Sequence, residues 1–162
     1  MVDPSRLIIR RLRPEDWDEF RSIRLRALAE DPDAFSSTLE EASRLDEAEW
    51  RRRLDARAQF IAISEGNAVG TAGGIETNGR AELISMWVDP VERRSGVGSR
   101  LVRAVAEWGR SRGHSRLWLW VVEGNQAAEA LYSREGFSRT GLRQQVNKQR
   151  PARLEFEMSL SL

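Results

Sequence analysis

Apolar positions in the first third of the chain recur at strand and helix spacings. The run at residues 7–9 predicts a short strand. From Pro14 to about Ala29 apolar residues recur three or four apart, which indicates a helix opened by proline and ended by residues 31–33. Residues 34–41 have no period, and we expect irregular structure there. Asp46 is a suitable N-cap for a second helix.

A three-stranded meander follows these helices. Strands are predicted at residues 60–63, 68–75 and 81–88, because each segment is largely apolar and is bounded by turn residues. Glu65-Gly66-Asn67 and Asn78-Gly79 are typical hairpin turns. The three strands should therefore pair in antiparallel fashion.

A strongly amphipathic helix begins the second half of the chain. Val97, Leu101, Val105 and Trp108 lie three or four apart, and Gly113 ends the pattern. The remaining elements are predicted as a strand at residues 117–122, a helix at 125–134, and strands at 137–142 and 153–162. The strand at 117–122 is almost wholly apolar, which indicates burial on both faces.

The predicted element order is β-α-α-β-β-β-α-β-α-β-β, in a single domain over residues 1–162. The strand–helix–strand passage from Ala81 to Val122 requires a parallel, right-handed crossover, whereas the hairpins require antiparallel neighbours. The fold class is therefore α/β (α+β), with a mixed sheet and helices on both of its faces.

Composition removes several functional classes. With 26 basic and 25 acidic residues the net charge is +1, so the chain lacks the basic excess of a nucleic-acid-binding protein. It has no cysteine and one histidine, His114, which excludes disulfides, cysteine nucleophiles and multi-histidine sites, and we expect no metal. His114 falls in a predicted loop, where a solvated role is favoured over a catalytic one.

The chain shows no signal for a membrane or for export. Its first residues lack the apolar stretch of a signal peptide, and its longest apolar run, Leu117–Val122, is far shorter than a membrane span. We therefore expect a cytoplasmic protein without a membrane partner.

The strongest chemical signal lies in the loop at residues 88–99. Gly96 and Gly98 remove side chains where a helix begins, and the free amide groups of a helix start favour an anion such as pyrophosphate. Arg93 and Arg94 add positive charge. A simple tight turn is the alternative. A Walker loop is absent, and a Rossmann loop would need a third glycine that is missing here.

Two segments carry a resemblance to a known family. Arg93-x-x-Gly96-x-Gly98 resembles the acetyl-CoA loop of the GNAT superfamily of N-acetyltransferases. The segment from Asn125 to Tyr132, closed by Gly136-Phe137, resembles the second signature of that family. Residues 32–35 resemble a substrate-side segment of many bacterial members. The resemblance implies a GNAT-like fold in which the strand at 81–88 splays away from the strand at 117–122.

The resemblance implies direct transfer of an acetyl group from acetyl-CoA to a primary amine, without a covalent acyl-enzyme. Absence of cysteine agrees with this route. Backbone groups of Trp87 and Val88 would bind the pantetheine arm and polarise the thioester carbonyl. Asn125 would bond the arm or position the helix that carries Tyr132. The residues expected at the cofactor are Trp87, Val88, Arg93, Arg94, Ser95, Gly96, Val97, Gly98, Ser99, Asn125 and Tyr132.

Two residues are predicted to move protons. By resemblance, Tyr132 donates a proton to the departing CoA thiolate, with a core tyrosine as the alternative. Glu82 lies eleven residues before Arg93, a spacing that a catalytic base has in some family members, and partial burial would raise its pKa. An ion-paired surface glutamate, and a water relay with no dedicated base, are open alternatives.

The leading hypothesis is an acetyl-CoA-dependent N-acetyltransferase. A non-catalytic acyl-CoA sensor on the same fold is the second, and an unrelated nucleotide-binding domain is the third. The amine acceptor is open among small amines, amino acids, antibiotics and protein amines. Trp87, Trp118 or Trp120 could wall its pocket. A homodimer is a habit of the family and stays open.

Overall fold

A seven-stranded mixed sheet organises the computed structural model, which describes residues 3–162. Met1 and Val2, part of the segment in which no export signal is predicted, lie outside the described residues. The strands are β1 (Leu7–Arg11), β2 (Ala58–Ser64), β3 (Asn67–Thr77), β4 (Arg80–Val88), β5 (Arg116–Val122), β6 (Ser138–Gln145) and β7 (Leu154–Ser161). The helices are α1 (Trp17–Glu30), α2 (Leu39–Ser43), α3 (Glu47–Asp55), α4 (Val97–Ser111) and α5 (Gln126–Arg134). The strand order in the sheet is β1-β2-β3-β4-β5-β7-β6.

The predicted order of elements is confirmed, with one addition. Helix α2 lies in the segment that the sequence analysis expected to be irregular. Thr38 caps it, because its hydroxyl accepts a hydrogen bond from the Glu41 amide at 3.1 Å while the Glu41 carboxylate accepts one from the Thr38 amide at 3.2 Å. This reciprocal arrangement is a capping box, and its Thr-x-x-Glu signature stands in the sequence.

Local signals fixed most of the other boundaries. Asp46 caps α3 as predicted, with its carboxylate 2.8 Å from the Glu49 amide. Asn78 and Gly79 both have positive φ, 51° and 75°, which is the conformation that a two-residue hairpin turn needs. The helix α4 buries Leu101 and Val105 completely, as its spacing predicted.

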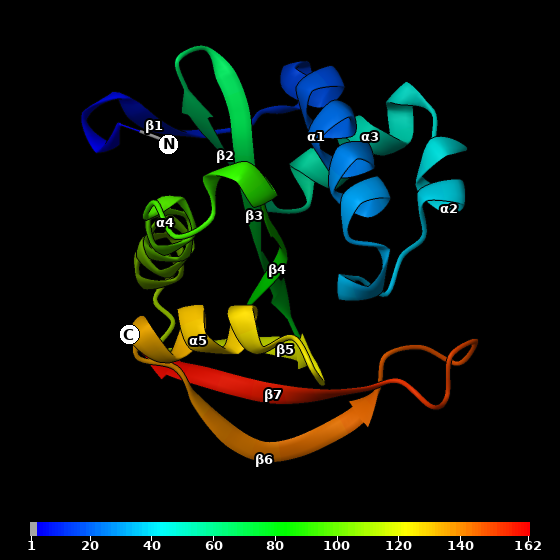
Figure 1. The fold of residues 1–162 in the computed structure, drawn as a ribbon, viewed down its shortest axis with the longest axis vertical. Helices are drawn as coiled ribbons and strands as arrows, with labels where there is room; N and C mark the ends of the chain where they lie inside the picture. Colours follow the sequence, from blue (N-terminus) through cyan, green and yellow to red (C-terminus); the bar gives the residue numbers. More distant parts are fainter. Residues whose placement is uncertain (1–2) are drawn as a thin grey trace.

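Helices cover both faces of the sheet, and each face has its own apolar layer. Figure 1 shows α4 and α5 on one side of the strands and α1 to α3 on the other. Leu101 and Tyr132 belong to the first layer. Phe20, Trp50 and Phe35 belong to the second.

The expectation that β5 is buried on both faces is wrong. Its burial alternates, with Leu117, Leu119 and Val121 buried against the α4 and α5 side. Trp118 and Trp120 point to the opposite face and are only partly buried. The reason is that α1 to α3 cover β2, β3 and the adjoining part of β4, so the same face at β5 is left without a helix.

The two central parallel strands pair over a very short distance. Only Ala81 with Leu117 and Glu82 with Trp118 are paired between β4 and β5. Beyond Glu82, β4 carries one extra residue relative to β3, and Ser85 adopts a positive φ of 55°. Such a β-bulge bends a strand and increases its twist. The bend turns β4 away from β5 and leaves one backbone edge of β4 without a strand partner.

Candidate active site

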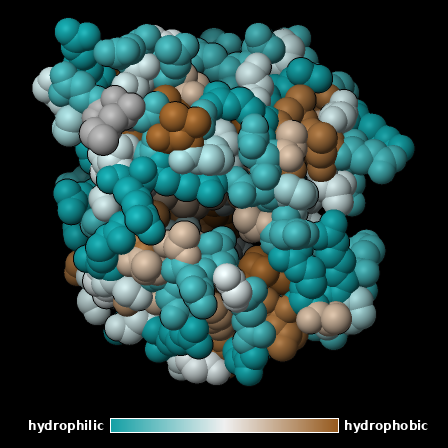
Figure 2. All heavy atoms as spheres, viewed as in Figure 1, coloured by the Kyte–Doolittle hydropathy of each residue, from teal (hydrophilic) through white to brown (hydrophobic). Residues whose placement is uncertain are grey.

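A groove of about 930 Å³ occupies the gap between β4 and β5. Figure 2 shows the molecule hollowed near the middle of this face, where β4 turns away from β5 in Figure 1. The volume is in the usual range for a cofactor or substrate pocket. Its walls come from β4, β5, the start of α4, α5 and the segment after α1. They include Asp31, Phe35, Leu83, Ile84, Ser85, Met86, Trp87, Val88, Arg93, Arg94, Gly96, Gly98, Ser99, Trp120, Val122, Asn125, Leu131 and Tyr132.

The start of α4 forms one end of this groove. Gly96 has a φ of 88° and is the N-cap residue, so a residue with a side chain would be strained there. A Cβ on Gly98 would lie 2.8 Å from Leu131 of α5, so glycine allows the two helices to approach. No side chain of residues 3–162 caps the first turn of α4. Its backbone amides are therefore available to an anion at the positive end of the helix.

Two other loop residues, both predicted at the cofactor, direct their side chains away from the groove. Val97 is 1% exposed and belongs to the apolar layer, so only its backbone can serve the groove. The hydroxyl of Ser95 donates a hydrogen bond to the carbonyl of Glu92, and Ser95 is not part of the groove wall. Both residues hold the shape of the loop.

Arg93 faces a protein carboxylate. Its Nη2 donates a hydrogen bond to Asp31 at 2.6 Å, and its Nε donates one to the carbonyl of Val88 at 3.0 Å. Arg94, with a positive φ of 66°, also lines the groove and makes no ion pair within residues 3–162. Of these two guanidinium groups, that of Arg94 is therefore the one free to meet an anion.

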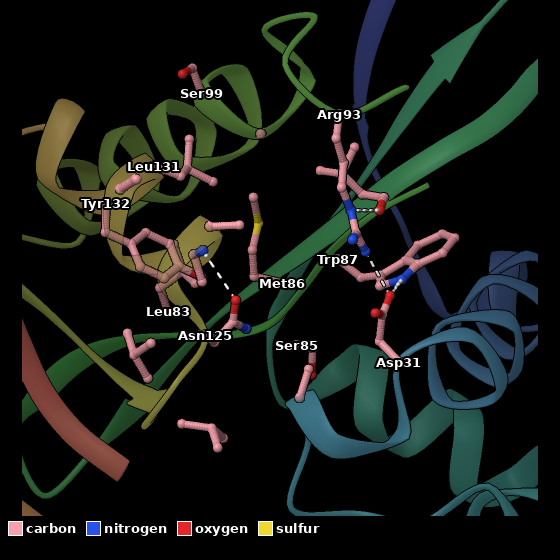
Figure 3. Close-up of a pocket in the computed structure, with 18 of the residues that line it drawn as sticks. Asp31, Leu83, Ser85, Met86, Trp87, Arg93, Ser99, Asn125, Leu131 and Tyr132 are labelled. Atoms are coloured by element: carbon pink, nitrogen blue, oxygen red, sulfur yellow. Dashed lines mark hydrogen bonds and ion pairs between the residues drawn. The ribbon is translucent and has the colours of Figure 1, made fainter. Parts of the chain in front are cut away.

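Asp31 joins three elements around the groove. The same carboxylate oxygen that accepts from Arg93 also accepts a hydrogen bond from the indole of Trp87 at 2.8 Å (Figure 3). Asp31 follows α1, Trp87 is in β4 and Arg93 precedes α4. The Cζ of Arg26 lies 5.1 Å from the centre of the Trp87 ring. This network fixes the segment after α1 to the end of β4 and to the loop.

Tyr132 projects from α5 into the opposite side of the groove (Figure 3). It is 5% exposed, and burial alone raises the pKa of its phenol above the usual range. The side chain of Asn125 caps α5 by accepting a hydrogen bond from the Ala128 amide at 3.2 Å. Two roles were predicted for Asn125, bonding the pantetheine arm or positioning the helix of Tyr132, and this cap corresponds to the second. The phenol is therefore neutral at physiological pH.

Glu82 lies at the closed end of the groove. It pairs with Trp118 where β4 and β5 part, and it is not among the residues that line the groove. Burial raises its pKa, with an opposing effect from Arg80 and a further increase from Glu157. Arg80 itself is held by Glu157 at 2.7 Å. Any proton that passes from the groove to Glu82 must therefore travel through an intervening group.

Sequence reasoning missed several parts of the wall. Asp31 was interpreted only as the end of a helix, and its partners come from β4 and the loop. Ser85 forms the bulge, and no glycine or proline at this position indicates it in the sequence. Trp120 lines the groove, whereas Trp118 lies outside it beneath the guanidinium of Arg80, at 3.7 Å.

Within residues 3–162, no three His, Cys, Asp or Glu side chains are grouped closely enough to hold a metal ion. In the same part of the chain no helix combines the length and the apolar character needed to cross a membrane.

Comparison with known proteins agrees with this geometry. A family model described as the acetyltransferase (GNAT) family matches residues 11–137. The chain belongs to the GNAT family. Mycothiol acetyltransferase of Thermobispora bispora is 33% identical over 144 residues, which cover 84% of this chain and 48% of that protein. The N-alpha-acetyltransferase RimI of Mycobacterium tuberculosis is 39% identical over 87 residues, 51% of this chain and 52% of that protein. The chain spans about half the length of these curated relatives.

Solved GNAT structures have the same fold. A GNAT-family acetyltransferase from Streptococcus pneumoniae matches with a TM-score of 0.80 at 22% identity, over 96% of this chain and 99% of that one. YncA from Salmonella typhimurium, solved with acetyl-CoA, matches with a TM-score of 0.77 at 19% identity, over 96% and 94% of the two chains. The predicted GNAT-like fold is thereby confirmed.

The Asp31–Arg93 pair should show measurable coupling in a double-mutant cycle. Because both side chains are partly exposed, 29% and 42%, solvent screening limits the expected coupling to about 0.5 kcal/mol. Urea unfolding of Asp31→Asn, Arg93→Gln and the double variant measures it. The more exposed pair Arg6–Glu65, which is not an i,i+4 helix pair, is the control, with a coupling near zero expected. Equal coupling in the two pairs would show that Asp31 does not fix the loop.

Proposed function

We propose that this protein transfers the acetyl group of acetyl-CoA directly to a primary amine, as a single acetyltransferase domain. The observation that carries the proposal is the groove itself. It combines an uncapped helix start, a free strand edge and a buried phenol. Family membership and the presence of acetyl-CoA in the YncA structure support the choice of donor.

The chain offers a matching surface for each part of the donor. The amides at the start of α4, with Arg94 beside them, suit the pyrophosphate. The unpaired edge of β4 suits the amide groups of the pantetheine arm, which would bind as an additional strand would. Among the carbonyls of β4, that of Val88 already accepts one hydrogen bond, from the Nε of Arg93, which leaves one lone pair for the arm.

Acetyl-CoA supplies an acetyl group activated as a thioester. The chain must then take a proton from the attacking amine and return one to the leaving sulfur. Tyr132 is suited to the second task, because its phenol faces the groove and burial keeps it protonated. The chain has no cysteine that could hold the acetyl group as a thioester, which supports direct attack of the amine on acetyl-CoA.

Glu82 is suited to the first task through a water molecule. It lies at the closed end of the groove, and its raised pKa makes it a stronger base than an exposed glutamate. The proposal therefore unites the two alternatives left open by the sequence, a glutamate base and a water relay. The named acceptors of the relatives differ from one another, so none is transferred to this chain.

A panel of primary amines tests the proposed function. Purified protein is mixed with acetyl-CoA and each amine, and the release of free thiol is followed. Turnover with at least one amine is the expected result. Tight binding of acetyl-CoA without turnover on any amine would favour the acyl-CoA sensor. Thermal protection by ATP or NAD but not by CoA would favour an unrelated nucleotide-binding domain.

Tyr132→Phe should separate chemistry from binding. Loss of the proton donor is expected to lower kcat about 10²-fold, while the affinity for CoA measured by calorimetry stays the same. Ser133→Ala, which removes an exposed hydroxyl from the next position of α5, is the matched control. An unchanged kcat in the phenylalanine variant would remove Tyr132 from the mechanism.

Glu82→Gln should lower activity and raise stability at the same time. We expect kcat/KM to fall about 10²-fold, with loss of the acid limb of the pH profile. Since burial raises the pKa of Glu82 above 4.5, its charge destabilises the fold as pH rises through the folded pKa. The gain in Tm should therefore be present at neutral pH and vanish below about pH 4.5.

Glu76→Gln is the control for this effect on Tm, because the pKa of Glu76 is shifted in the opposite direction to that of Glu82. Hydrogen bonds from Arg112 and then His114 lower the pKa of Glu76 to about 2. Its removal should therefore lower Tm at neutral pH. A glutamine at residue 82 that also lowers Tm would show that Glu82 is a structural ion-pair partner.

A further inference from the structure

Three buried N–H donors lie in the helix layer of α1 and α3 without an acceptor. Arg24 of α1 is only 7% exposed, and no group in residues 3–162 accepts a hydrogen bond from its Nη1. The Nε of Arg57, just before β2, is likewise buried and without a partner in that part of the chain. So is the indole Nε1 of Trp50 in α3. Native proteins rarely leave buried donors unsatisfied, because each costs about 1–3 kcal/mol and a charged one more.

The same layer places positive charges together. Burial, followed by the charges of Arg57 and Arg53, lowers the pKa of Arg24 to about 10. Burial and Arg53 also lower the pKa of Arg57 to about 10. The charged neighbours that shift these two groups are all arginines. A buried cation is stable only when an opposite charge accompanies it, so the missing component is an anion.

Aromatic rings pack against the flat faces of these two guanidinium groups, but within residues 3–162 no acceptor meets the buried N–H groups at their edges. The Cζ of Arg24 lies 4.6 Å from the centre of the Phe35 ring, and that of Arg57 lies 5.7 Å from the centre of Phe20. Phe20 in turn packs edge-on against Trp50, with ring centres 5.3 Å apart. Stacking leaves the N–H groups in the guanidinium plane free to donate. The acceptor must therefore approach within that plane.

We propose that Arg24 and Arg57 bind a small monovalent anion, chloride or a carboxylate of the size of formate, inside the α1–α3 layer. A water molecule could accept the hydrogen bonds but would leave the positive charges unneutralised. None of these donors lines the groove, so the site does not depend on the proposed acetyl transfer. Its connection to the groove is Phe35, which rests on Arg24 and forms part of the groove wall. The anion would stabilise the layer that supports this wall.

Thermal unfolding in different sodium salts at one fixed ionic strength tests the site. Chloride or formate replaces gluconate, an anion too large for a buried position. Each tenfold rise in a bound anion above its dissociation constant should raise Tm by about 3–5 °C. A rise with chloride alone identifies a halide site, and a rise with formate alone identifies a carboxylate site. Identical Tm values in all three salts would overturn the proposal.

Arg24→Met connects the effect to the residue. This variant keeps an unbranched apolar stem and removes the guanidinium group with its charge, so its Tm should no longer depend on chloride or formate. Its Tm in gluconate should exceed that of the wild type, because an unpaired buried charge is gone. Arg21→Met, three residues earlier on α1 and outside any ion pair of residues 3–162, should keep the wild-type dependence.

Two further measurements cover a variant that does not fold. Arg57→Met should also reduce the anion dependence. If chloride raises the wild-type Tm, crystals of the wild type grown in bromide should show anomalous scattering beside Nη1 of Arg24, and bromide found only elsewhere would contradict the assignment. Wild-type anion dependence in Arg24→Met or in Arg57→Met would also contradict it.

Discussion

The limited pairing between β4 and β5 is the constraint on which the rest of the structure depends. Two backbone pairs hold the halves of the sheet together, and beyond them the bulge at Ser85 carries β4 away. The hydrogen-bonding edge that β5 leaves unused becomes a surface for a ligand. The start of α4 and the phenol of Tyr132 both face the resulting groove. Strand pairing continued by a few more residues would close this space.

Local signals predicted most of the elements, and long-range contacts account for what was missed. The cap at Asp46 and the turn at Asn78-Gly79 are specified within four residues, so the sequence alone identifies them. The capping box at Thr38 was equally local and was overlooked. The bulge at Ser85 depends on how β4 meets β3, and no residue type marks it. The role of Arg93 depends on Asp31, which lies 62 positions away in the chain.

Arginine side chains serve this fold in ways that their number alone does not reveal. Arg93 is neutralised by Asp31 and acts as a brace for the loop. Arg94, the next residue along the same turn, keeps its charge available at the groove. Arg24 is buried among rings and other cations. Each of these arginines has the same formal charge, whereas its surroundings decide how that charge affects ligand binding and the stability of the fold.

The close approach of Gly98 to Leu131 has a consequence for which substrates can share the groove. Because this contact sets how α5 sits against the first turn of α4, the helix start and the neighbouring phenol keep one separation. Under the proposed function, that separation fixes how far the sulfur of the donor lies from its diphosphate when both are bound. A longer acyl chain can then extend only past the sulfur, into the remaining part of the groove. Acyl length and acceptor bulk would thus compete for a single volume.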